Sequence, residues 1–295
     1  MSDHGYHPDL ERVVCTKDRL GETPLWCGRT KKIWWIDIEE PKLQSFDPVS
    51  GAHLVYPMDC TYLGSLALTK TDQLLVAMDL TLSLFNPDTG DITPLAKVDD
   101  GLDNRLNDGR VDRKGRFWVG TMDNQLRQPN GSLYRLGQDG SIANLLDGII
   151  VTNGIAHSPD NRTLYFTDTR RFTTWAFDLD PDDGTISNRR IFADYTATGD
   201  RPDGACIDVD GCLWTAFFAG SRIVRYRPDG GIDQTIPLPV SNPTCVCFGG
   251  EDLKTLYITT ASKFLTAEQR AAEPWAGSLL AIQGIGQGVA EHRFG

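Results

Sequence analysis

The chain has 295 residues, of which 40% are hydrophobic and 23% are charged, a size that allows two average domains or one large all-β domain. Its formal net charge of −11 argues against a nucleic-acid or anionic-membrane surface, because both require clustered lysine and arginine. No apolar run is long enough for a transmembrane helix, and the N-terminus has no secretory signal, which predicts a cytoplasmic protein.

A turn followed by a short apolar strand with a large central residue occurs six times. The central residues, spaced 41 to 49 positions apart, are Trp34, Leu75, Trp118, Tyr165, Trp214 and Tyr257. A second strand ending in a turn follows each of them. Six such units, each long enough for about four strands, predict an all-β fold, a six-bladed β-propeller that spans residues 1–295 as a single domain. The alternative, a β-sandwich, gives no reason for a sixfold repeat.

The two ends of the chain are expected to close the ring. Residues 11–16 form a strand-like segment before the first unit, and residues 288–294 form another after the sixth. We predict that these segments pair in one composite blade, which would remove an exposed sheet edge. Residues 1–10 are expected to form a loose N-terminal extension. The helix candidate is 266–273, with Thr266 as N-cap and Pro274 as the stop, between strands of the last blade.

The seven cysteines are odd in number and include no Cys-x-x-Cys pair. Cys245 and Cys247 flank one residue of a strand-like run, so their side chains would share a face. We interpret all seven as reduced packing residues rather than disulfides or metal ligands.

Four polar segments lie shortly before the repeated strands, at Leu20–Trp26, Arg105–Gly109, Val151–Gly154 and Arg201–Gly204. We interpret them as loops. Equivalent places in different blades lie on one face of a propeller, around its channel, so four side chains should converge there: Glu22, Asn107, Asn153 and Asp203. Two carboxylates and two amide oxygens make a hard site for a divalent cation. Any one of these segments alone is an ordinary turn, and their shared phase in the repeat favours the site.

Several motifs in these segments occur together along the chain. They are Gly21-Glu22-x-Pro24-x-Trp26, Arg105-x-Asn107-Asp108-Gly109, Gly120-Thr121-Met122, Thr152-Asn153-Gly154, Pro202-Asp203-Gly204, Ile186-Ser187-Asn188-Arg189-Arg190 and Cys247-Phe248-Gly249-Gly250. In these motifs the chain resembles the senescence-marker-protein/gluconolactonase/regucalcin family of six-bladed propeller sugar lactonases. The resemblance covers nearly the whole chain.

The resemblance implies one divalent metal held by Glu22, Asn153 and Asp203. It also implies that Arg105 and Asn107 bind the substrate, a small-molecule sugar lactone. Some relatives carry a glutamate that contacts the sugar after Gly-Thr-Met. Here the run is Asp123-Asn124-Gln125, so no substrate contact is carried over to these three residues.

These residue types suit the hydrolysis of an aldonolactone to the aldonic acid. A lactone is a cyclic ester, and a divalent cation can act as a Lewis acid on its carbonyl oxygen. Asp203 is the expected base, because Glu22 lies in an apolar context that suits a fixed ligand. The guanidinium of Arg105 offers donors to substrate hydroxyls or to the developing oxyanion. The cation is not specified, since Ca²⁺, Zn²⁺, Mn²⁺, Mg²⁺ and Fe²⁺ all suit an open oxygen site.

Two other function classes stay open from the sequence. One is a metal-dependent propeller hydrolase of aryl esters or phosphotriesters, which would favour a more apolar mouth. The other is a non-catalytic calcium-binding protein, which would need the carboxylates but not Arg105. His157 is interpreted as a packing or turn residue. The pair Arg170-Arg171 either reaches an acidic substituent or forms a solvated loop. We expect a monomer or weak dimer.

Overall fold

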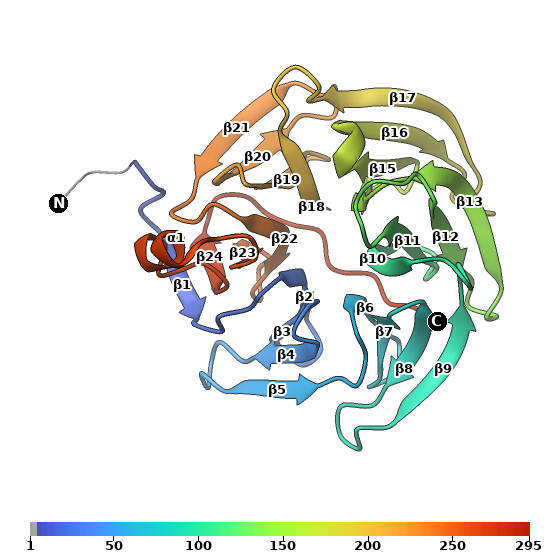
Figure 1. Ribbon diagram of the computed structural model, residues 1–295, viewed down its shortest axis with the longest axis horizontal. Coiled ribbons are helices and arrows are strands. Elements are labelled where there is room, and N and C mark those ends of the chain that lie inside the picture. The colour runs from blue at the N-terminus through green and yellow to red at the C-terminus, as the bar shows by residue number, and fades with distance from the viewer. Residues whose placement is uncertain (1–4) are drawn as a thin grey trace.

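The computed structural model describes residues 5–295, and its 24 strands form six antiparallel sheets of four strands each. The sheets are arranged as blades around a central channel (Figure 1). This confirms the predicted all-β fold class and the six-bladed β-propeller. Within the described residues, no helix has the length and apolar character needed to cross a membrane.

Each blade runs from a first strand beside the channel to a fourth strand at the rim (Figure 1). Blade 1 contains β2 (Gly21–Cys27), β3 (Lys32–Asp37), β4 (Lys42–Phe46) and β5 (His53–Pro57). Blade 2 contains β6 (Leu63–Leu68), β7 (Leu74–Met78), β8 (Thr81–Phe85) and β9 (Ile92–Lys97). Blade 3 contains β10 (Asn104–Val111), β11 (Phe117–Asp123), β12 (Gly131–Leu136) and β13 (Ile142–Ile149).

Blade 4 contains β14 (Thr152–His157), β15 (Thr163–Asp168), β16 (Thr173–Leu179) and β17 (Ile186–Asp194). Blade 5 contains β18 (Arg201–Ile207), β19 (Leu213–Phe218), β20 (Arg222–Tyr226) and β21 (Ile232–Pro237). Blade 6 contains β22 (Pro243–Gly249), β23 (Thr255–Thr260), β24 (Leu279–Gln283) and, at its rim, β1 (Leu10–Val14). The six repeated central residues all lie in second strands, and the second repeated unit forms the third strands.

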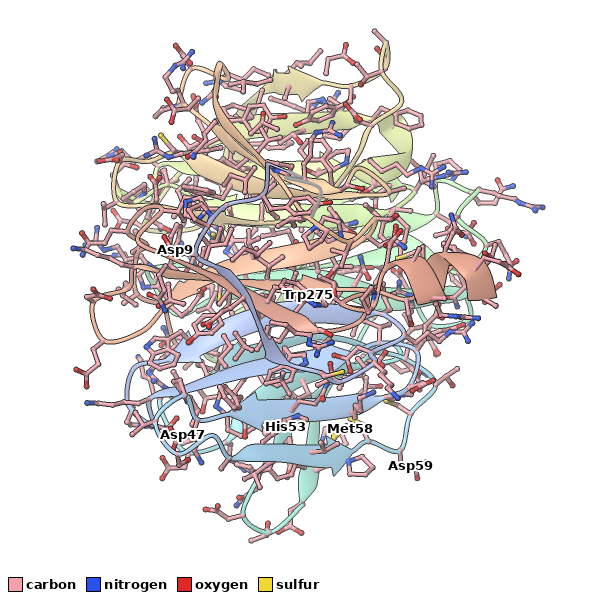
Figure 2. All side chains as sticks on the ribbon, turned by 90° about the vertical axis from the view of Figure 1, so that its left-hand side faces the viewer. Asp9, Asp47, His53, Met58, Asp59 and Trp275 are labelled. Carbon is pink, nitrogen blue, oxygen red and sulfur yellow. The ribbon has the colours of Figure 1, made fainter. Side chains whose placement is uncertain are left out.

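The N-terminal strand closes the ring, but not with the partner that the sequence predicted. β1 pairs with β24, in a register that joins Leu10 to Ile282. Arg12 also donates to the carbonyl of Pro274 at 3.1 Å. The next residue, Trp275, is labelled on the edge of the ring that Figure 2 presents. Residues 288–294, the predicted partner, form no part of this sheet. β1 already supplies the fourth strand of blade 6. Pairing of residues 288–294 with this sheet would have added a fifth strand, which no other blade has.

Deleting residues 1–14 should lower the melting temperature of the whole domain. The deletion removes β1 and leaves the edge of β24 without a partner. We expect a fall of about 5 °C or more, since a loss of about 2 kcal/mol moves the midpoint of a large domain by that order. Thermal unfolding followed by circular dichroism measures the change. Deletion of residues 1–9, which keeps β1, is the control, and equal melting temperatures for the two proteins would contradict the closure.

Tryptophans in the second strands are held by a repeated turn aspartate. Asp112 accepts from the indole of Trp118 at 2.9 Å, and Asp208 accepts from that of Trp214 at 2.9 Å. A buried indole N–H group requires such an acceptor. The repeated turns therefore have a structural role, which separates them from the polar residues at the start of the first strands.

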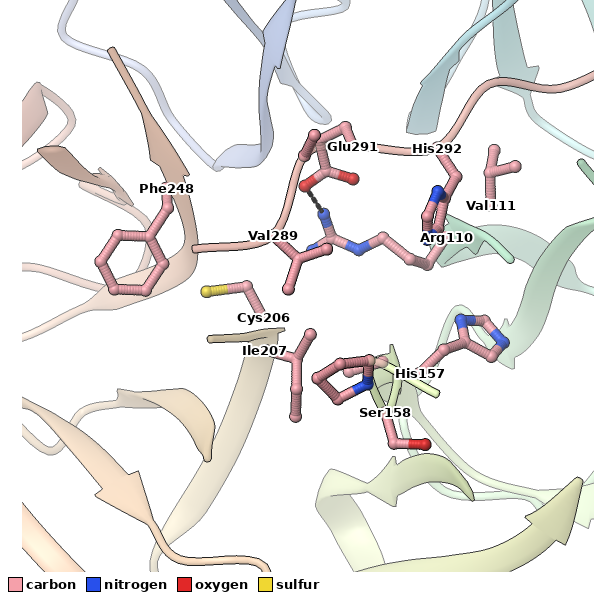
Figure 3. Close-up of a pocket in the computed structure, with 13 residues that line it drawn as sticks. Arg110, Val111, His157, Ser158, Cys206, Ile207, Phe248, Val289, Glu291 and His292 are labelled. Atoms are coloured by element: carbon pink, nitrogen blue, oxygen red, sulfur yellow. Dashed lines mark hydrogen bonds and ion pairs between the residues drawn. The ribbon is translucent and has the colours of Figure 1, made fainter. Parts of the chain in front are cut away.

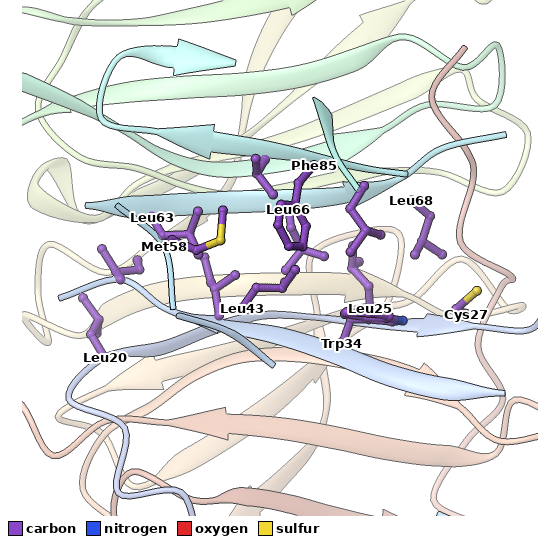
Figure 4. Close-up of a cluster of buried hydrophobic side chains, with 14 of the residues drawn as sticks. Leu20, Leu25, Cys27, Trp34, Leu43, Met58, Leu63, Leu66, Leu68 and Phe85 are labelled. Atoms are coloured by element: carbon purple, nitrogen blue, oxygen red, sulfur yellow. The ribbon is translucent and has the colours of Figure 1, made fainter. Parts of the chain in front are cut away.

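Neighbouring blades meet through apolar clusters rather than one central core. In the cluster between blades 1 and 2, Leu25, Trp34 and Leu43 lie with Leu66 and Phe85 (Figure 4). Burial of one large apolar side chain contributes roughly 1.5–3 kcal/mol to the free energy of folding, so each cluster holds two neighbouring blades firmly together. The first strands are thereby fixed as a rigid frame around the channel.

The C-terminal segment crosses the end of the channel at which the first strands finish (Figure 1). Gly288 donates its N–H to the carbonyl of Leu253 at 2.8 Å, and Phe294 donates to that of Leu68 at 2.8 Å. These bonds join the segment to blades 6 and 2. Residues 288–294 thus cover the channel instead of completing a blade.

Arg110 links the channel wall to this C-terminal segment (Figure 3). Its guanidinium donates to Glu291 at 2.6 Å and to the carbonyl of Ala205 at 2.7 Å. The side chains of this ion pair are only 8% and 13% exposed. A cavity of about 40 Å³ remains beside them, which is room for water rather than for a sugar.

His157 faces this small cavity as a neutral ring (Figure 3). It packs edge-to-face against Trp118, with ring centroids 5.5 Å apart. Neither ring nitrogen has a hydrogen-bond partner within residues 5–295. Burial lowers the pKa of His157 from 6.5 to about 3, and the carboxylate of Asp112 only partly opposes that effect.

Replacing His157 with leucine should flatten the dependence of stability on pH. The folded-state pKa lies below the unfolded value, so the stability contributed by neutral His157 is present above pH 6.5 and is lost as the pH falls toward 3. Between pH 6.5 and 5 the wild type should lose about 1.5 kcal/mol through this residue. Urea unfolding of His157→Leu and the wild type at both pH values measures the difference. Parallel losses in the two proteins would contradict a buried neutral histidine.

The smaller predictions have mixed outcomes. The helix is confirmed as α1 (Ala267–Ala272), between β23 and β24, with Thr266 accepting from the N–H of Gln269 at 3.2 Å. All seven cysteines are free, as predicted. Cys15 is exposed just beyond the rim strand β1, so its interpretation as a packing residue is wrong. The predicted extension over residues 1–10 includes residues 1–4, which lie outside the described part of the chain.

Candidate functional site

The four segments interpreted as polar loops are first strands, and each contains a β-bulge. In β10, Asn107 and Asp108 together oppose the single residue Gly120 of β11. Comparable register shifts in β2, β14 and β18 begin at Glu22, Asn153 and Pro202. A bulge takes side chains out of the usual alternation and re-aims them. The loop interpretation is therefore wrong, because strand pairing continues past these buried polar residues.

All five predicted site residues line one pocket, at the end of the channel opposite the C-terminal segment. The pocket has a cavity volume of about 100 Å³. Its polar lining includes Glu22, Arg105, Asn107, Asn153 and Asp203, each between 5% and 7% exposed. A cavity in which a few buried polar groups converge is the expected form of a small-molecule site.

Hydrogen bonds fix the orientation of the two asparagines. The amide nitrogen of Asn107 donates to the carbonyl of Thr152 at 2.7 Å and to the side-chain oxygen of Asn153 at 3.1 Å. The amide nitrogen of Asn153 donates to the hydroxyl of Thr169 at 2.8 Å, and this hydroxyl donates to the carbonyl of Pro202 at 2.6 Å. The side-chain oxygen of Asn153 keeps a second lone pair for a further ligand.

The carboxylates of Glu22 and Asp203 are only partly compensated by the protein. One oxygen of Glu22 accepts from the N–H of Thr23 at 2.9 Å. Burial raises the pKa of Glu22 to about 8, and the carboxylate of Asp108 adds to the rise. Burial also raises the pKa of Asp203, with the two other carboxylates adding to the effect and Arg105 opposing it. The interior of the pocket therefore favours an added positive charge.

Arg105 is held against the wall of the pocket. Its guanidinium carbon lies 5.5 Å from the ring centroid of Tyr62, and Nη1 donates to Asn107 and to the carbonyl of Leu106 at 3.2 Å. Burial lowers the pKa of Arg105 to about 10, so the group stays cationic at neutral pH. Its other N–H groups can donate to a substrate.

The donor set fits a divalent cation chemically. Among residues 5–295, no three His, Cys, Asp or Glu side chains form a metal-binding group. The candidate ligands are instead the two carboxylates of Glu22 and Asp203 and the amide oxygen of Asn153. All-oxygen ligands suit hard cations such as Ca²⁺, Mg²⁺ and Mn²⁺. A cation at this place would also offset the repulsion between two buried carboxylates.

Three further polar residues of the pocket were not identified from the sequence: Thr169, Arg201 and Lys263. Arg201 could have been predicted, because it lies two residues before Asp203 and residues two positions apart share a face of a strand. Thr169 and Lys263 follow the second strands of their blades, where the sequence has no periodic pattern. Asp108 is adjacent to the pocket, but its carboxylate accepts from the N–H of Ile155 at 2.8 Å and so supports the bulge of β14.

Two segments with open roles are now placed. Arg170 lines the pocket, whereas Arg171 forms an ion pair with Asp168 at 3.2 Å. At Gly-Thr-Met and beyond it, the pocket is lined by Met122, the last residue of that motif, and by Leu126. The intervening residues serve the fold: the carboxylate of Asp123 accepts from two backbone N–H groups of the following turn, both at 2.8 Å. The side-chain amides of Asn124 and Gln125 both donate to the carboxylate of Asp103.

Comparisons with known proteins agree with the resemblance. A regucalcin from Xenopus laevis is 35% identical over 293 residues, which are 97% of this chain and 98% of the relative. A 6-deoxy-6-sulfogluconolactonase from Pseudomonas putida is 36% identical over 289 residues, again 97% and 98% of the two chains. The solved structure of a calcium-binding protein, regucalcin, from Agrobacterium tumefaciens has a TM-score of 0.92 at 29% identity and covers 96% of each chain.

The family match itself extends over most of the propeller. Residues 20–262 match the SMP-30/gluconolactonase/LRE-like region. This range includes all five residues that converge in the pocket. By its sequence and by its fold, the chain belongs to the SMP-30/gluconolactonase/LRE-like family.

Proposed function

We propose that the protein is a metal-dependent lactonase that hydrolyses a sugar-acid lactone, an aldonolactone, to the free aldonic acid. Family membership supports the reaction class, because one relative is named a 6-deoxy-6-sulfogluconolactonase and another a putative sugar lactone lactonase. The observation that carries the proposal is the pocket, in which two buried carboxylates lie with two oriented asparagines and a cationic Arg105.

Glu22, Asn153 and Asp203 are the proposed metal ligands. A bound divalent cation would supply a Lewis acid for the lactone carbonyl. The oxygen donors favour calcium, magnesium or manganese, and the description of a solved relative as a calcium-binding protein supports calcium first. Zinc and iron(II) are alternatives for an open site of this kind.

Asp203 is the proposed base. In ring opening, water oxygen bonds to the carbonyl carbon, the ring carbon–oxygen bond breaks, and the ring oxygen leaves as a hydroxyl group. Asp203 would accept the proton of the attacking water and return it to the departing oxygen. Glu22 is the proposed fixed ligand, and the N–H of Thr23 orients one of its oxygens at 2.9 Å. Arg105 would donate to the oxygen that gains negative charge, with Asn107 binding the substrate beside it.

A second candidate function follows from the apolar side of the same pocket. Met122, Leu126, Phe218 and Phe264 line it, and the two phenylalanine rings pack edge-to-face with centroids 6.2 Å apart. Such a wall could also hold the aromatic ring of an aryl ester. The pocket is therefore compatible with a metal-dependent esterase or phosphotriesterase.

Acid release from a panel of substrates tests these functions together. The metal-stripped protein should be supplied with one divalent cation at a time and offered pentono- and hexonolactones, an aryl ester and a phosphotriester. We expect fastest turnover of an aldonolactone, and only with a cation present. Faster turnover of the aryl ester or the phosphotriester would favour the second candidate. Absence of all turnover with tight calcium binding would identify a binding protein instead.

A further inference from the structure

Two guanidinium groups at the mouth of the pocket have no counter-ion among residues 5–295. Arg170, in the short 3₁₀ helix η1 (Thr169–Arg171), and Arg201, at the start of β18, are exposed and line the pocket. Within residues 5–295, neither guanidinium makes an ion pair or a hydrogen bond. The other cation at the mouth, Lys263, is already paired with Glu39.

The two arginines belong to adjacent points of blades 4 and 5. The hydroxyl of Thr169 donates to the carbonyl of Pro202 at 2.6 Å. Each arginine directly neighbours one member of this bonded pair in sequence, and one residue advances the chain by about 3.8 Å. Asn153 donates to the same threonine hydroxyl at 2.8 Å. The backbones of both arginines therefore lie close to the proposed cation ligands, and their side chains extend from there.

The carboxylates nearest in sequence do not neutralise these arginines. Asp168 is engaged by Arg171 at 3.2 Å, and Asp200 is engaged by Arg222 at 2.7 Å. The chain as a whole has a net charge of −11. Two uncompensated cations at one pocket mouth run against that overall charge, and such a pair suits an anionic ligand group.

We infer that the pocket binds a lactone with an anionic group (a phosphate or carboxylate) on the part of the sugar farthest from the lactone carbonyl. This inference rests on the proposed function and deepens it by naming the substrate class. Guanidinium forks form paired hydrogen bonds with such oxyanions. Arg170 and Arg201 bind the anionic group, and the carbonyl lies toward the cation ligands. This orientation also keeps the anion away from the buried carboxylates of Glu22 and Asp203.

Two matched pairs of lactones test the inference. The phosphate arm compares 6-phosphoglucono-1,5-lactone with glucono-1,5-lactone, and the carboxylate arm compares glucaro-1,4-lactone with glucono-1,4-lactone, each corrected for uncatalysed opening. In at least one arm, kcat/KM should be about 10- to 100-fold higher for the anionic member. This preference should shrink as salt rises from low to high concentration, because exposed charges are screened.

Variants assign the preference to the two arginines. The double variant Arg170→Ala/Arg201→Ala should bring the ratio of kcat/KM values close to one, and Arg170→Glu/Arg201→Glu should invert it. Arg162→Ala is the matched control, since Arg162 is an exposed arginine in the turn after β14, at the other end of the channel. Its ratio should equal that of the wild type.

The outcomes separate this inference from the proposed function. If neutral lactones are hydrolysed and neither arm shows a preference, the inference is overturned and the lactonase proposal stands. A preference that survives Arg170→Ala/Arg201→Ala also overturns it. If no lactone is hydrolysed, calorimetry with 6-phosphogluconate and gluconate decides. Binding of the phosphate compound about 10-fold tighter, lost in the double variant, supports an anion site in a protein that is not a lactonase, and equal binding overturns it.

Discussion

Asp203→Asn should reduce lactone turnover by about 10²–10⁴-fold, the usual contribution of a general base. The amide has the size of the carboxylate but cannot accept the proton of the attacking water. If Asp203 is the base, turnover stays low even when the cation site is saturated. If it is only a ligand, excess cation restores much of the rate. Acid release at rising cation concentration, with cation occupancy measured in parallel by calorimetry, distinguishes the two roles.

The matched control for this variant is Asp139→Asn. Asp139 is an exposed turn residue of blade 3, so the same chemical change there should leave turnover unaltered. Asp112→Asn is unsuitable as a control, because buried Asp112 accepts from Arg116 at 2.6 Å and from Trp118 at 2.9 Å. Recovery of the wild-type rate at saturating cation would show that the assignment of Asp203 as base is wrong.

Glu22→Gln should weaken cation binding on the order of 100-fold, since even outer partners of metal ligands contribute 10–100-fold. Binding to the native state alone stabilises it, so the effect can be measured without turnover. At a cation concentration about 1,000 times the wild-type Kd, the wild type should gain about 4.1 kcal/mol and the variant about 1.4 kcal/mol. Urea unfolding with and without the cation gives both values. Asn153→Ala and Asp203→Asn should change binding in the same direction.

The cation-free variant provides the check on folding. Glu22 is buried near the carboxylates of Asp203 and Asp108, and glutamine is neutral at every pH, so it cannot carry the charge that burial and these neighbours disfavour. Glu22→Gln should therefore be as stable as the wild type, or more stable, when no cation is present. An equal gain of stability from the cation in variant and wild type would exclude Glu22 as a ligand.

The architecture could be predicted from the sequence, because each blade repeats its own local chemistry. A turn aspartate, a strand with a central tryptophan or other large residue, and a second turn recur often enough to indicate six blades. The helix was readable for the same reason, since Thr266 and Gln269 form its cap within four residues of each other. The phase of the repeat also placed Glu22, Asn107, Asn153 and Asp203 at one end of the channel, where the structure brings them together.

The contacts between segments that are distant in sequence could not be predicted, because they depend on the folded arrangement of the blades. Residues 10–14 and 288–294 are both strand-like in sequence. In the folded protein, residues 10–14 pair with the edge of β24 and complete blade 6, so that edge is no longer open to residues 288–294. The bulges were also not readable, because the extra residue in a strand such as β10 is defined only by its pairing with β11. Arg170 and Arg171 are chemically identical neighbours. The carboxylate of Asp168 pairs with Arg171, three residues further along the chain. Arg170 lines the pocket only because residues of other blades complete that pocket, and local sequence does not place those blades.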